Sequence, residues 1–224
     1  TVITNIEEKV IFKDLSTTID LLFPNDTITH SFAPQSNLPI IGQLDYNHSD
    51  ITNVWAVINN AQNIPLFEFG GGLGGNYSSG RWTGNFNNVP TGVHSIRLIA
   101  YDSNNNIVAT SAPASFTVSS FDGSLPPYVS MEDLIVDTAT STSFIPLTAI
   151  GTDVDGAFTG MQFYVDGQPY SNPIFRPSGL SQNLANYTTI LALNSSGINT
   201  VFAIGWDNSG NYVATPVKNL SVTS

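Results

Sequence analysis

The sequence contains no cysteine, which excludes disulfide bonds, thiolate catalysis and cysteine-ligated metal sites. Basic residues are also scarce, because only 6 Lys and Arg stand against 17 Asp and Glu, for a formal net charge of −11. A surface with this charge repels phosphate backbones, so we expect no nucleic-acid partner. The same surface is suited to binding cations.

Strong helix formers such as Glu, Lys, Arg and Met are rare, whereas Asn, Ser, Thr and Gly are abundant. This composition predicts an all-β protein. No stretch approaches the roughly 18 consecutive apolar residues of a transmembrane helix, so we expect no membrane insertion. The chain begins with Thr and carries no signal segment, and we expect a mature or trimmed part of an exported protein.

One segment of the chain is written twice. Residues 92–110 recur at 197–215 with seven identities in 19 positions and no gap. Random composition would give roughly one or two identities, so the repeat predicts a duplicated domain. A slightly larger shift also aligns VWAVINN at 54–60 with MQFYVDG at 161–167.

The repeat places the expected domains at 26–121 and 122–224, joined near the Gly- and Pro-containing stretch SSFDGSLPP. Residues 1–25 lie outside the repeat. They are expected to supply extra strands to the first domain or a strand donated to a neighbouring subunit. Donation would make the protein a homo-oligomer through its N-terminal strand, because an exposed sheet edge accepts an added strand.

Within each copy the apolar residues recur with a period of two. Met161, Phe163 and Val165 alternate with polar or smaller neighbours, and turn signals such as DVDG at 153–156 and DNSGN at 207–211 separate the runs. Short alternating strands of this kind predict two tandem immunoglobulin-like antiparallel β-sandwiches. In such a fold each sheet buries one face, and the loops gather at the two ends.

Two stretches of the second copy resemble a bacterial immunoglobulin-like domain: FIPLTAIGTDVDGAFTGMQFYVDGQPY at 144–170 and GINTVFAIGWDNSGNYVATPVKNLSV at 197–222. The first copy is similar mainly over its last two strands, and YNHSDI at 46–51 departs from the DVDG pattern. The resemblance implies tandem domains of an exported surface protein, located outside the cell or on its surface. It implies a fold rather than an activity, because this sandwich supports many functions.

Acidic and amide side chains gather in the expected end loops of the second copy. Asp153 and Asp155 lie in one loop, and Asp207 and Asn211 lie in another loop at the same end of an immunoglobulin-like sandwich. Ca²⁺ prefers carboxylate, amide and carbonyl oxygens, so these four residues are the candidate calcium ligands. Ordinary turns are the alternative, because Asp and Asn bond to their own backbone there. A weaker set lies in the first copy: Asp50, Asp102 and Asn106.

Aromatic side chains near the Gly-rich stretch FGGGLGGN are candidate contacts for a glycan, namely Tyr77 and Trp82. However, Trp82 and Phe86 alternate on one face and align with Tyr187 and Leu191 of the second copy. That alignment favours core packing for Trp82 and leaves Tyr77 as the better surface candidate.

The sequence carries no recognised catalytic motif. His30, His48 and His94 stand far apart, and neither G-x-S-x-G nor Ser-x-x-Lys occurs. The G-x-G-x-x-G pattern at 70–75 would bind a nucleotide only if a helix followed, and RWTGNF predicts a strand. We therefore expect no enzyme activity and no cofactor other than calcium.

The expected function is a non-catalytic extracellular structural or adhesive module. It would be a repeat unit of a surface protein, or the subunit of an extracellular filament or surface layer. The alternative is a carbohydrate-binding or accessory module of a secreted polysaccharide-degrading enzyme. The expected partners are other protein subunits or cell-surface glycans.

Overall fold

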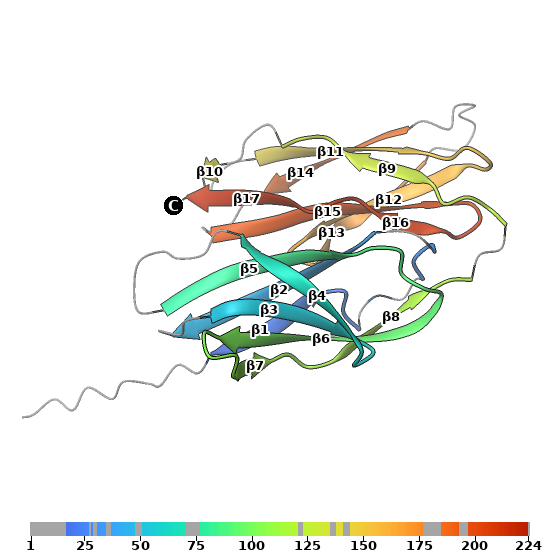
Figure 1. Cartoon of the computed structure of the whole chain (residues 1–224). Coiled ribbons are helices and arrows are strands. Elements are labelled where there is room, and N and C mark those ends of the chain that lie inside the picture. Colours follow the sequence, from blue (N-terminus) through green and yellow to red (C-terminus); the bar gives the residue numbers. More distant parts are fainter. Residues whose placement is uncertain are drawn as a thin grey trace, which may run out of the picture.

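The computed structural model consists of strands and connecting turns, with no helix among the residues that it describes (Figure 1). It describes residues 17–26, 28, 31–34, 37–47, 51–69, 77–120, 123–134, 138–140, 144–176, 185–192 and 197–223. Within these ranges no helix is long and apolar enough to cross a membrane. The prediction of an all-β fold is confirmed.

Strands β1–β8 form the first half of the fold and strands β9–β17 form the second half. The bounds in the first half are β1 (Thr18–Phe23), β2 (Leu38–Asn47), β3 (Ile51–Ile58), β4 (Gln62–Phe69), β5 (Tyr77–Phe86), β6 (Gly92–Asp102), β7 (Ile107–Thr110) and β8 (Ala114–Val118). The bounds in the second half are β9 (Tyr128–Met131), β10 (Thr138–Thr140), β11 (Phe144–Thr152), β12 (Phe158–Val165), β13 (Gln168–Phe175), β14 (Ala185–Ala192), β15 (Gly197–Asp207), β16 (Tyr212–Ala214) and β17 (Lys218–Thr223).

The sheet of the first half runs in the order β1-β2-β5-β4-β3-β6-β7, with β8 also paired to β6. Strand β4 changes partner along its length, because residues 62–66 pair with β3 and residues 67–69 pair with β5. The sheet therefore turns over at β4 and closes a sandwich. Its two layers are β1-β2-β5 and β3-β6-β7-β8.

The second half repeats this plan with two separate sheets. A three-stranded sheet has the order β14-β11-β9, and a six-stranded sheet has the order β10-β17-β15-β12-β13 with β16 paired to β15. All of its pairs are antiparallel except β10 with β17. This is the arrangement of an immunoglobulin-like β-sandwich, as the sequence predicts. Its core is a separate apolar cluster that includes Leu147, Phe158 and Phe163.

The N-terminal segment contributes the first strand of the first half. Strand β1 pairs with β2 of its own chain in antiparallel register, with Ile19 opposite Leu44 and Phe23 opposite Ile41. It occupies the place that β9 takes beside β11 in the second half. Residues 18–23 therefore form the extra strand of the first alternative within their own chain, and donation of an N-terminal strand to a neighbouring subunit stays a prediction. Residues 1–16 lie outside the described residues.

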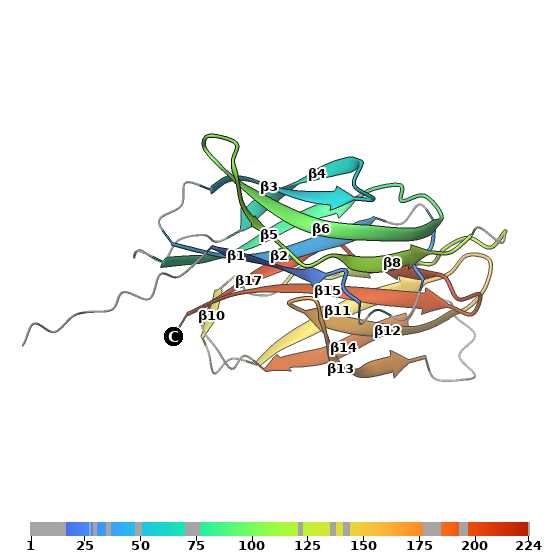
Figure 2. The ribbon, with the colours of Figure 1, turned by 90° about the horizontal axis from the view of Figure 1, so that it is seen from below.

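The two halves lie face to face rather than end to end. Figures 1 and 2 show the two halves side by side, and Figure 2 shows β1-β2-β5 between β3-β4-β6 and the second half. Because Phe23 of β1 meets Phe202 of β15, the sheet layers follow one another in the order β9-β11-β14, β12-β15-β16-β17, β1-β2-β5 and β3-β6-β7. The core of the first half continues into the second, because the same buried cluster contains Leu98 and also Tyr164, Phe202 and Ile204. The predicted domain boundary at 121/122 stays a prediction, since those two residues lie outside the described residues.

Candidate functional site

The structure brings together the four residues predicted as calcium ligands. Asp153 and Asp155 follow β11, and Asp207 and Asn211 flank the turn between β15 and β16. The N–H of Asp155 donates to Asp153 Oδ1 at 3.3 Å, and Asn211 Nδ2 donates to Asp207 Oδ2 at 2.8 Å. Asp153, Asp207 and Asn211 are buried, which is unusual for turn residues on a surface loop.

The two loops are joined to each other at one end of the sandwich. The N–H of Ala157 donates to Asn208 Oδ1 at 2.8 Å, and the N–H of Asn208 donates to the Ala157 carbonyl at 2.9 Å. The predicted proximity of the two loops is therefore confirmed. Asp207 is also committed to its own turn, because its Oδ1 accepts the N–H groups of Ser209 and Asn211 at 2.8 and 2.9 Å. These contacts are ordinary turn chemistry, and calcium binding at this cluster stays a prediction.

Burial raises the pKa of the Asp153 carboxyl, and the charge of Asp207 nearby adds to the rise. A pKa raised by folding favours the folded state at acid pH, and this contribution is lost as the pH rises through the folded value. We therefore expect Asp153→Asn to melt at a higher temperature than the native chain at pH 7. The difference should disappear as the pH falls below about 3.9, the ordinary Asp value. Melting curves across this pH range, recorded in chelator, check the prediction.

Bound calcium would make the native chain, rather than Asp153→Asn, the protein with the higher melting temperature. If an ion uses the Asp153 carboxylate, then added Ca²⁺ raises the melting temperature of the native chain and leaves Asp153→Asn unchanged. If neither protein responds to Ca²⁺ or to chelator, the cluster is a set of turns. The same pair of variants therefore decides between the two interpretations of these loops.

The weaker set in the first half is a simple turn. The side chain and N–H of Asn106 donate to the two oxygens of Asp102 at 3.0 and 2.8 Å. These hydrogen bonds hold the pKa of Asp102 below its usual range. The third predicted member, Asp50, lies outside the described residues.

The aromatic residues predicted as glycan contacts do not form a surface site. Trp82 is only 6% exposed and belongs, with Phe86, to the core of the first half. The aligned Tyr187 belongs to the core of the second half. The glycan role of Trp82 is therefore corrected, because a sugar can stack only on an exposed ring, and core packing is confirmed. Tyr77 begins β5, and its side chain lies outside the described residues.

The structure places His94 in a structural role. Its ring is buried, stacks on Phe116 with centroids 5.2 Å apart, and bonds to Asn59 Nδ2 and the Pro90 carbonyl at 3.0 and 2.7 Å. Across the described ranges, no group of three or more His, Asp or Glu side chains is arranged to hold a metal ion. The other two histidines and the Gly-rich pattern at 70–75 lie outside the described residues.

Buried aromatic side chains line the surface between the two halves. Phe23 at the end of β1 is fully buried and meets Tyr164 and Phe202 of the second half, with ring centroids 5.9 and 4.7 Å apart. Tyr164 and Phe202 also stack on each other at 5.0 Å. Burial raises the pKa of Tyr164 to about 12. Aromatic groups in this edge-to-face and stacked geometry stabilise an interface beyond the area that they bury.

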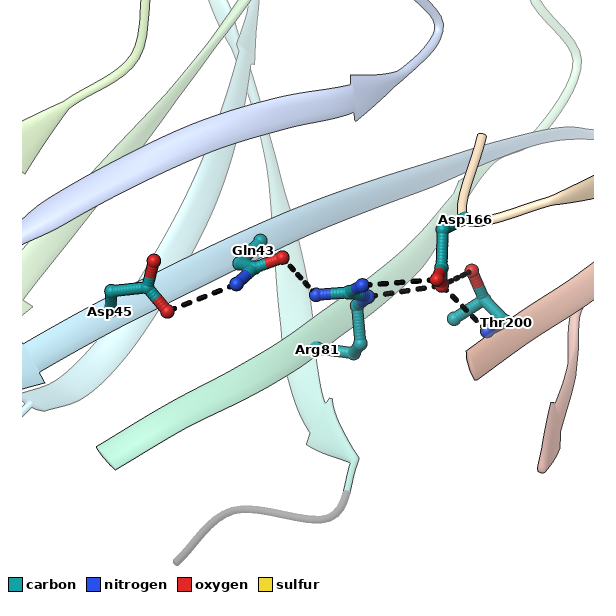
Figure 3. A network of polar contacts seen from close by, with 5 residues as sticks. All are labelled: Gln43, Asp45, Arg81, Asp166 and Thr200. Atoms are coloured by element: carbon teal, nitrogen blue, oxygen red, sulfur yellow. Dashed lines mark hydrogen bonds and ion pairs between the residues drawn. The ribbon is translucent and has the colours of Figure 1, made fainter. Parts of the chain in front are cut away.

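A polar chain of residues crosses the same surface (Figure 3). Arg81 on β5 forms a two-pronged ion pair with Asp166, since both Nε and Nη2 lie 3.1 Å from its carboxylate oxygens. Asp166 is positioned by the N–H and hydroxyl of Thr200, at 2.9 and 3.1 Å. Arg81 in turn donates to Gln43, which donates to Asp45 at 3.0 Å. Arg81 and Asp166 are largely shielded from water, so their pairing sets the register of one half on the other.

A second feature was not predicted from the sequence. On the outer face of the first half, Trp55, Tyr101 and three asparagines line a shallow hollow of about 130 Å³. The asparagines are Asn53, Asn63 and Asn105. The alternation of Asn53, Trp55 and Val57 along β3 places Trp55 on this outer face. Asparagine is so common in the chain that its presence there gave no distinct signal.

No family model and no curated protein matches this chain. Among solved structures, it is similar to the fibronectin(III)-like modules of Clostridium thermocellum CbhA, at 15% identity and a TM-score of 0.34, over 91% of this chain and 92% of that one. It is also similar to the D0-D1 domain of intimin, at 12% identity and 0.32, over 92% and 98%. The N-terminal Ig1-2 module of the Drosophila receptor protein tyrosine phosphatase DLAR matches at 12% and 0.33, over 93% and 100%. Likeness at this level says nothing about what the chain binds or does.

Proposed function

We propose that the chain is a non-catalytic structural module of an exported protein, in which two immunoglobulin-like sandwiches act as one rigid block. The observation that carries the proposal is the apolar core that runs from the first half into the second through Phe23, Tyr164 and Phe202. Halves joined only by a linker move relative to each other, whereas a shared buried core holds them together. A module of this kind transmits force and keeps a constant spacing between its neighbours.

Composition supports an extracellular or cell-surface location. The chain has no cysteine that oxidation could damage, and its net charge of −11 keeps it soluble and repels nucleic acid. The strands are rich in Thr, Ser and Asn, as in the bacterial immunoglobulin-like domains that the second half resembles.

Mechanical unfolding tests the rigid block. Pulled from its two ends, the chain is expected to unfold in one event whose length gain covers both halves, because the first half shares its core with the second. An extended chain spans at most about 3.3–3.6 Å per residue, so one event for the whole chain and two events for separate sandwiches differ clearly in length. Two events of about equal length, in most traces, would contradict the proposal.

A second function has one observation in its favour. The hollow lined by Trp55, Tyr101 and three asparagines combines aromatic faces with amide groups that can both donate and accept hydrogen bonds. Sugar rings present apolar faces and hydroxyl edges, so this lining suits a glycan. The carbohydrate-binding alternative therefore moves from Trp82 to Trp55.

Affinity electrophoresis in soluble β-glucan, xylan and galactomannan tests this alternative. Binding through the hollow predicts that the native chain is retarded by at least one polymer and that Trp55→Ala weakens binding by at least about tenfold, as at other tryptophan anchors. Tyr128→Ala removes an exposed ring from the other half, one that is 64% exposed, and should leave the mobility unchanged. If no polymer retards the native chain, or if both variants behave alike, this alternative is wrong.

A further inference from the structure

Two equivalent turns show which strands of the first half correspond to which strands of the second. The side chain of Asn59 accepts the N–H of Ser95 at 2.9 Å, and the side chain of Asp166 accepts the N–H of Thr200 at the same distance. Asn59 and Asp166 also share a left-handed backbone, with φ of 51° and 50°. Strands β3 and β6 of the first half therefore correspond to β12 and β15 of the second.

The other layer corresponds in the same way. In the first half Gly42 of β2 lies opposite Trp82 of β5, and in the second half Ala149 of β11 lies opposite Tyr187 of β14. Strands β2 and β5 thus correspond to β11 and β14. Each half therefore has one layer built on the β3-β6 or β12-β15 pair and one layer built on the β2-β5 or β11-β14 pair.

Within the chain, the β2-β5 layer of the first half is stacked on the β12-β15 layer of the second. The outward face of β1-β2-β5 presents Phe23, Ile41 and Arg81, and it covers the outward face of β12-β15, which presents Phe202 and Ile204. Ile41, Phe202 and Ile204 are almost completely buried as a result. The chain therefore already contains one complete contact between the two kinds of face.

Within the part of the chain that the structure describes, one face of each kind stays uncovered, at the two opposite ends of the stack (Figure 1). At one end lies β9-β11-β14, the counterpart of the layer that does the covering. Phe144 is 76% exposed there and Ile190 is 59% exposed, with Tyr128 and Pro146 also exposed. These three strands contain no charged residue, although the chain carries 23 Lys, Arg, Asp and Glu in total. An uncharged sheet face with large exposed apolar side chains is typical of an interaction surface.

The face at the other end is the counterpart of the layer that is covered. On β3, β6 and β7 it presents Trp55, Tyr101 and Ile107, and Ile107 is 60% exposed. Arg97, at the position corresponding to Phe202, has a buried Nε without a hydrogen-bond partner in the described part of the chain. The outer face of β11 and β14 carries hydroxyl groups, including that of Thr188, which are suited to accept from this Nε when the two outer faces of different copies meet.

We propose that a second copy of the chain docks head to tail, its β9-β11-β14 face on the β3-β6-β7 face of the first copy. The contact repeats between chains the stacking that the two halves already make within one chain. Because the two faces differ, the contact leaves one free face of each kind on every dimer and continues as a linear fibre. This proposal rests on the structural role proposed above and names the partner as the chain itself.

Salt dependence follows from the charge distribution. The net charge of −11 makes two copies repel each other, while the docking face of β9-β11-β14 carries none of that charge. Screening removes the repulsion and leaves the apolar contact intact. Association is therefore expected to strengthen as salt is added, opposite to an assembly held by ion pairs.

Sedimentation velocity of the whole chain tests the proposal, at rising protein concentration and at low and high salt. The native chain is expected to form a series of species that grows with concentration and salt. Phe144→Asp disrupts the β9-β11-β14 face (the Phe144 face), and Trp55→Asp disrupts the β3-β6-β7 face (the Trp55 face). Each variant should therefore remain monomeric. Ile107→Asp, at an exposed position of the Trp55 face, provides a second variant should Trp55→Asp fail to fold. Val154→Asp changes an equally exposed residue outside both faces and should assemble like the native chain.

The decisive arm mixes two defective proteins. Phe144→Asp keeps an intact Trp55 face, and Ile107→Asp keeps an intact Phe144 face, so the mixture is expected to form dimers that stop at two copies. A symmetric contact of one face with itself predicts no such rescue and would overturn the head-to-tail arrangement. A native chain that stays monomeric under every condition also overturns it. Neither result affects the single mechanical unfolding event that tests the structural role.

Discussion

Replacing Phe23 with alanine is expected to lower the free energy of unfolding by about 3–5 kcal/mol, the usual range for a buried phenylalanine. The side chain is 0% exposed and lies between Phe32 of its own half and Phe202 of the other, at centroid distances of 6.1 and 4.7 Å. Its loss opens a cavity at the point where the two cores meet. We expect the single calorimetric transition of the native chain to separate into two, because each half keeps its own remaining core.

Phe67→Ala is the matched control for that experiment. Phe67 lies on β4 of the first half and is 69% exposed, so its removal should change stability by less than about 0.5 kcal/mol. Both variants lose the same chemical group, and only one of them loses it from the surface between the halves. Equal effects of the two substitutions, or an unsplit transition in Phe23→Ala, would count against the shared core.

Gly167→Ala is expected to have the second large effect, at about 3 kcal/mol or more. Gly167 lies in the β12–β13 turn with φ of 76°, where a Cβ would lie 2.3 Å from the carbonyl oxygen of Leu22 in the first half. A backbone atom cannot move aside as the end of a flexible side chain can, so the turn must lift away from β1. The cost therefore combines left-handed strain with a steric clash across the surface between the halves.

Gly210→Ala separates those two contributions. Gly210 has a similar φ of 84°, and a Cβ there would meet no atom within 4 Å. This variant carries only the backbone strain, about 1–2 kcal/mol. Denaturant unfolding of both proteins gives the difference directly. If the two alanine variants are equally stable, the turn at Gly167 does not press against β1.

The repeat at 92–110 and 197–215 predicted correctly that β6–β7 and β15–β16 correspond, because the same residues build the same turn. Asp102 and Asp207 each accept the N–H of the asparagine four residues later, at 2.8 and 2.9 Å. The copies then diverge, since the β6–β7 register contains a bulge between Ala100 and Tyr101 that the ungapped alignment does not show. Local turn chemistry is readable from sequence, whereas a single inserted residue in a strand pair is not.

The sequence predicted extra strands in residues 1–25 without showing their counterpart in the second half, because β1 reads TIDLLF and β9 reads YVSM. A strand is specified by which side chains fit a half-buried surface, and many sequences meet that requirement. No residue identity therefore marked 18–23 as the counterpart of 128–131. The extension could only be assigned once its partner strand was known.

The stacking of the halves also left a trace in the sequence. Val201, Phe202, Ala203 and Ile204 are consecutive and all nearly inaccessible, so β15 is buried on both faces. A strand with one solvated face alternates, whereas an unbroken apolar run indicates burial on both sides. The run shows that something covers β15, and only the structure identifies the cover as β1-β2-β5. The hollow at Trp55 was not predicted, because a tryptophan on an alternating strand is typical of a core as well as of a surface site.

A distance between the two outermost layers tests the face-to-face block most directly. The chain has no cysteine, so spin labels at Thr110→Cys on β7 and Thr188→Cys on β14 report without background. Four stacked layers at about 10 Å per spacing place the backbones of the two outer layers about 30 Å apart, and labels on these exposed positions lie somewhat farther apart. In labelled protein diluted with an excess of unlabelled chain, so that only distances within one chain are recorded, the account predicts one narrow distribution at or somewhat above that value, unchanged by salt. A broad distribution, or one centred at a much longer distance that shifts with salt, would contradict it.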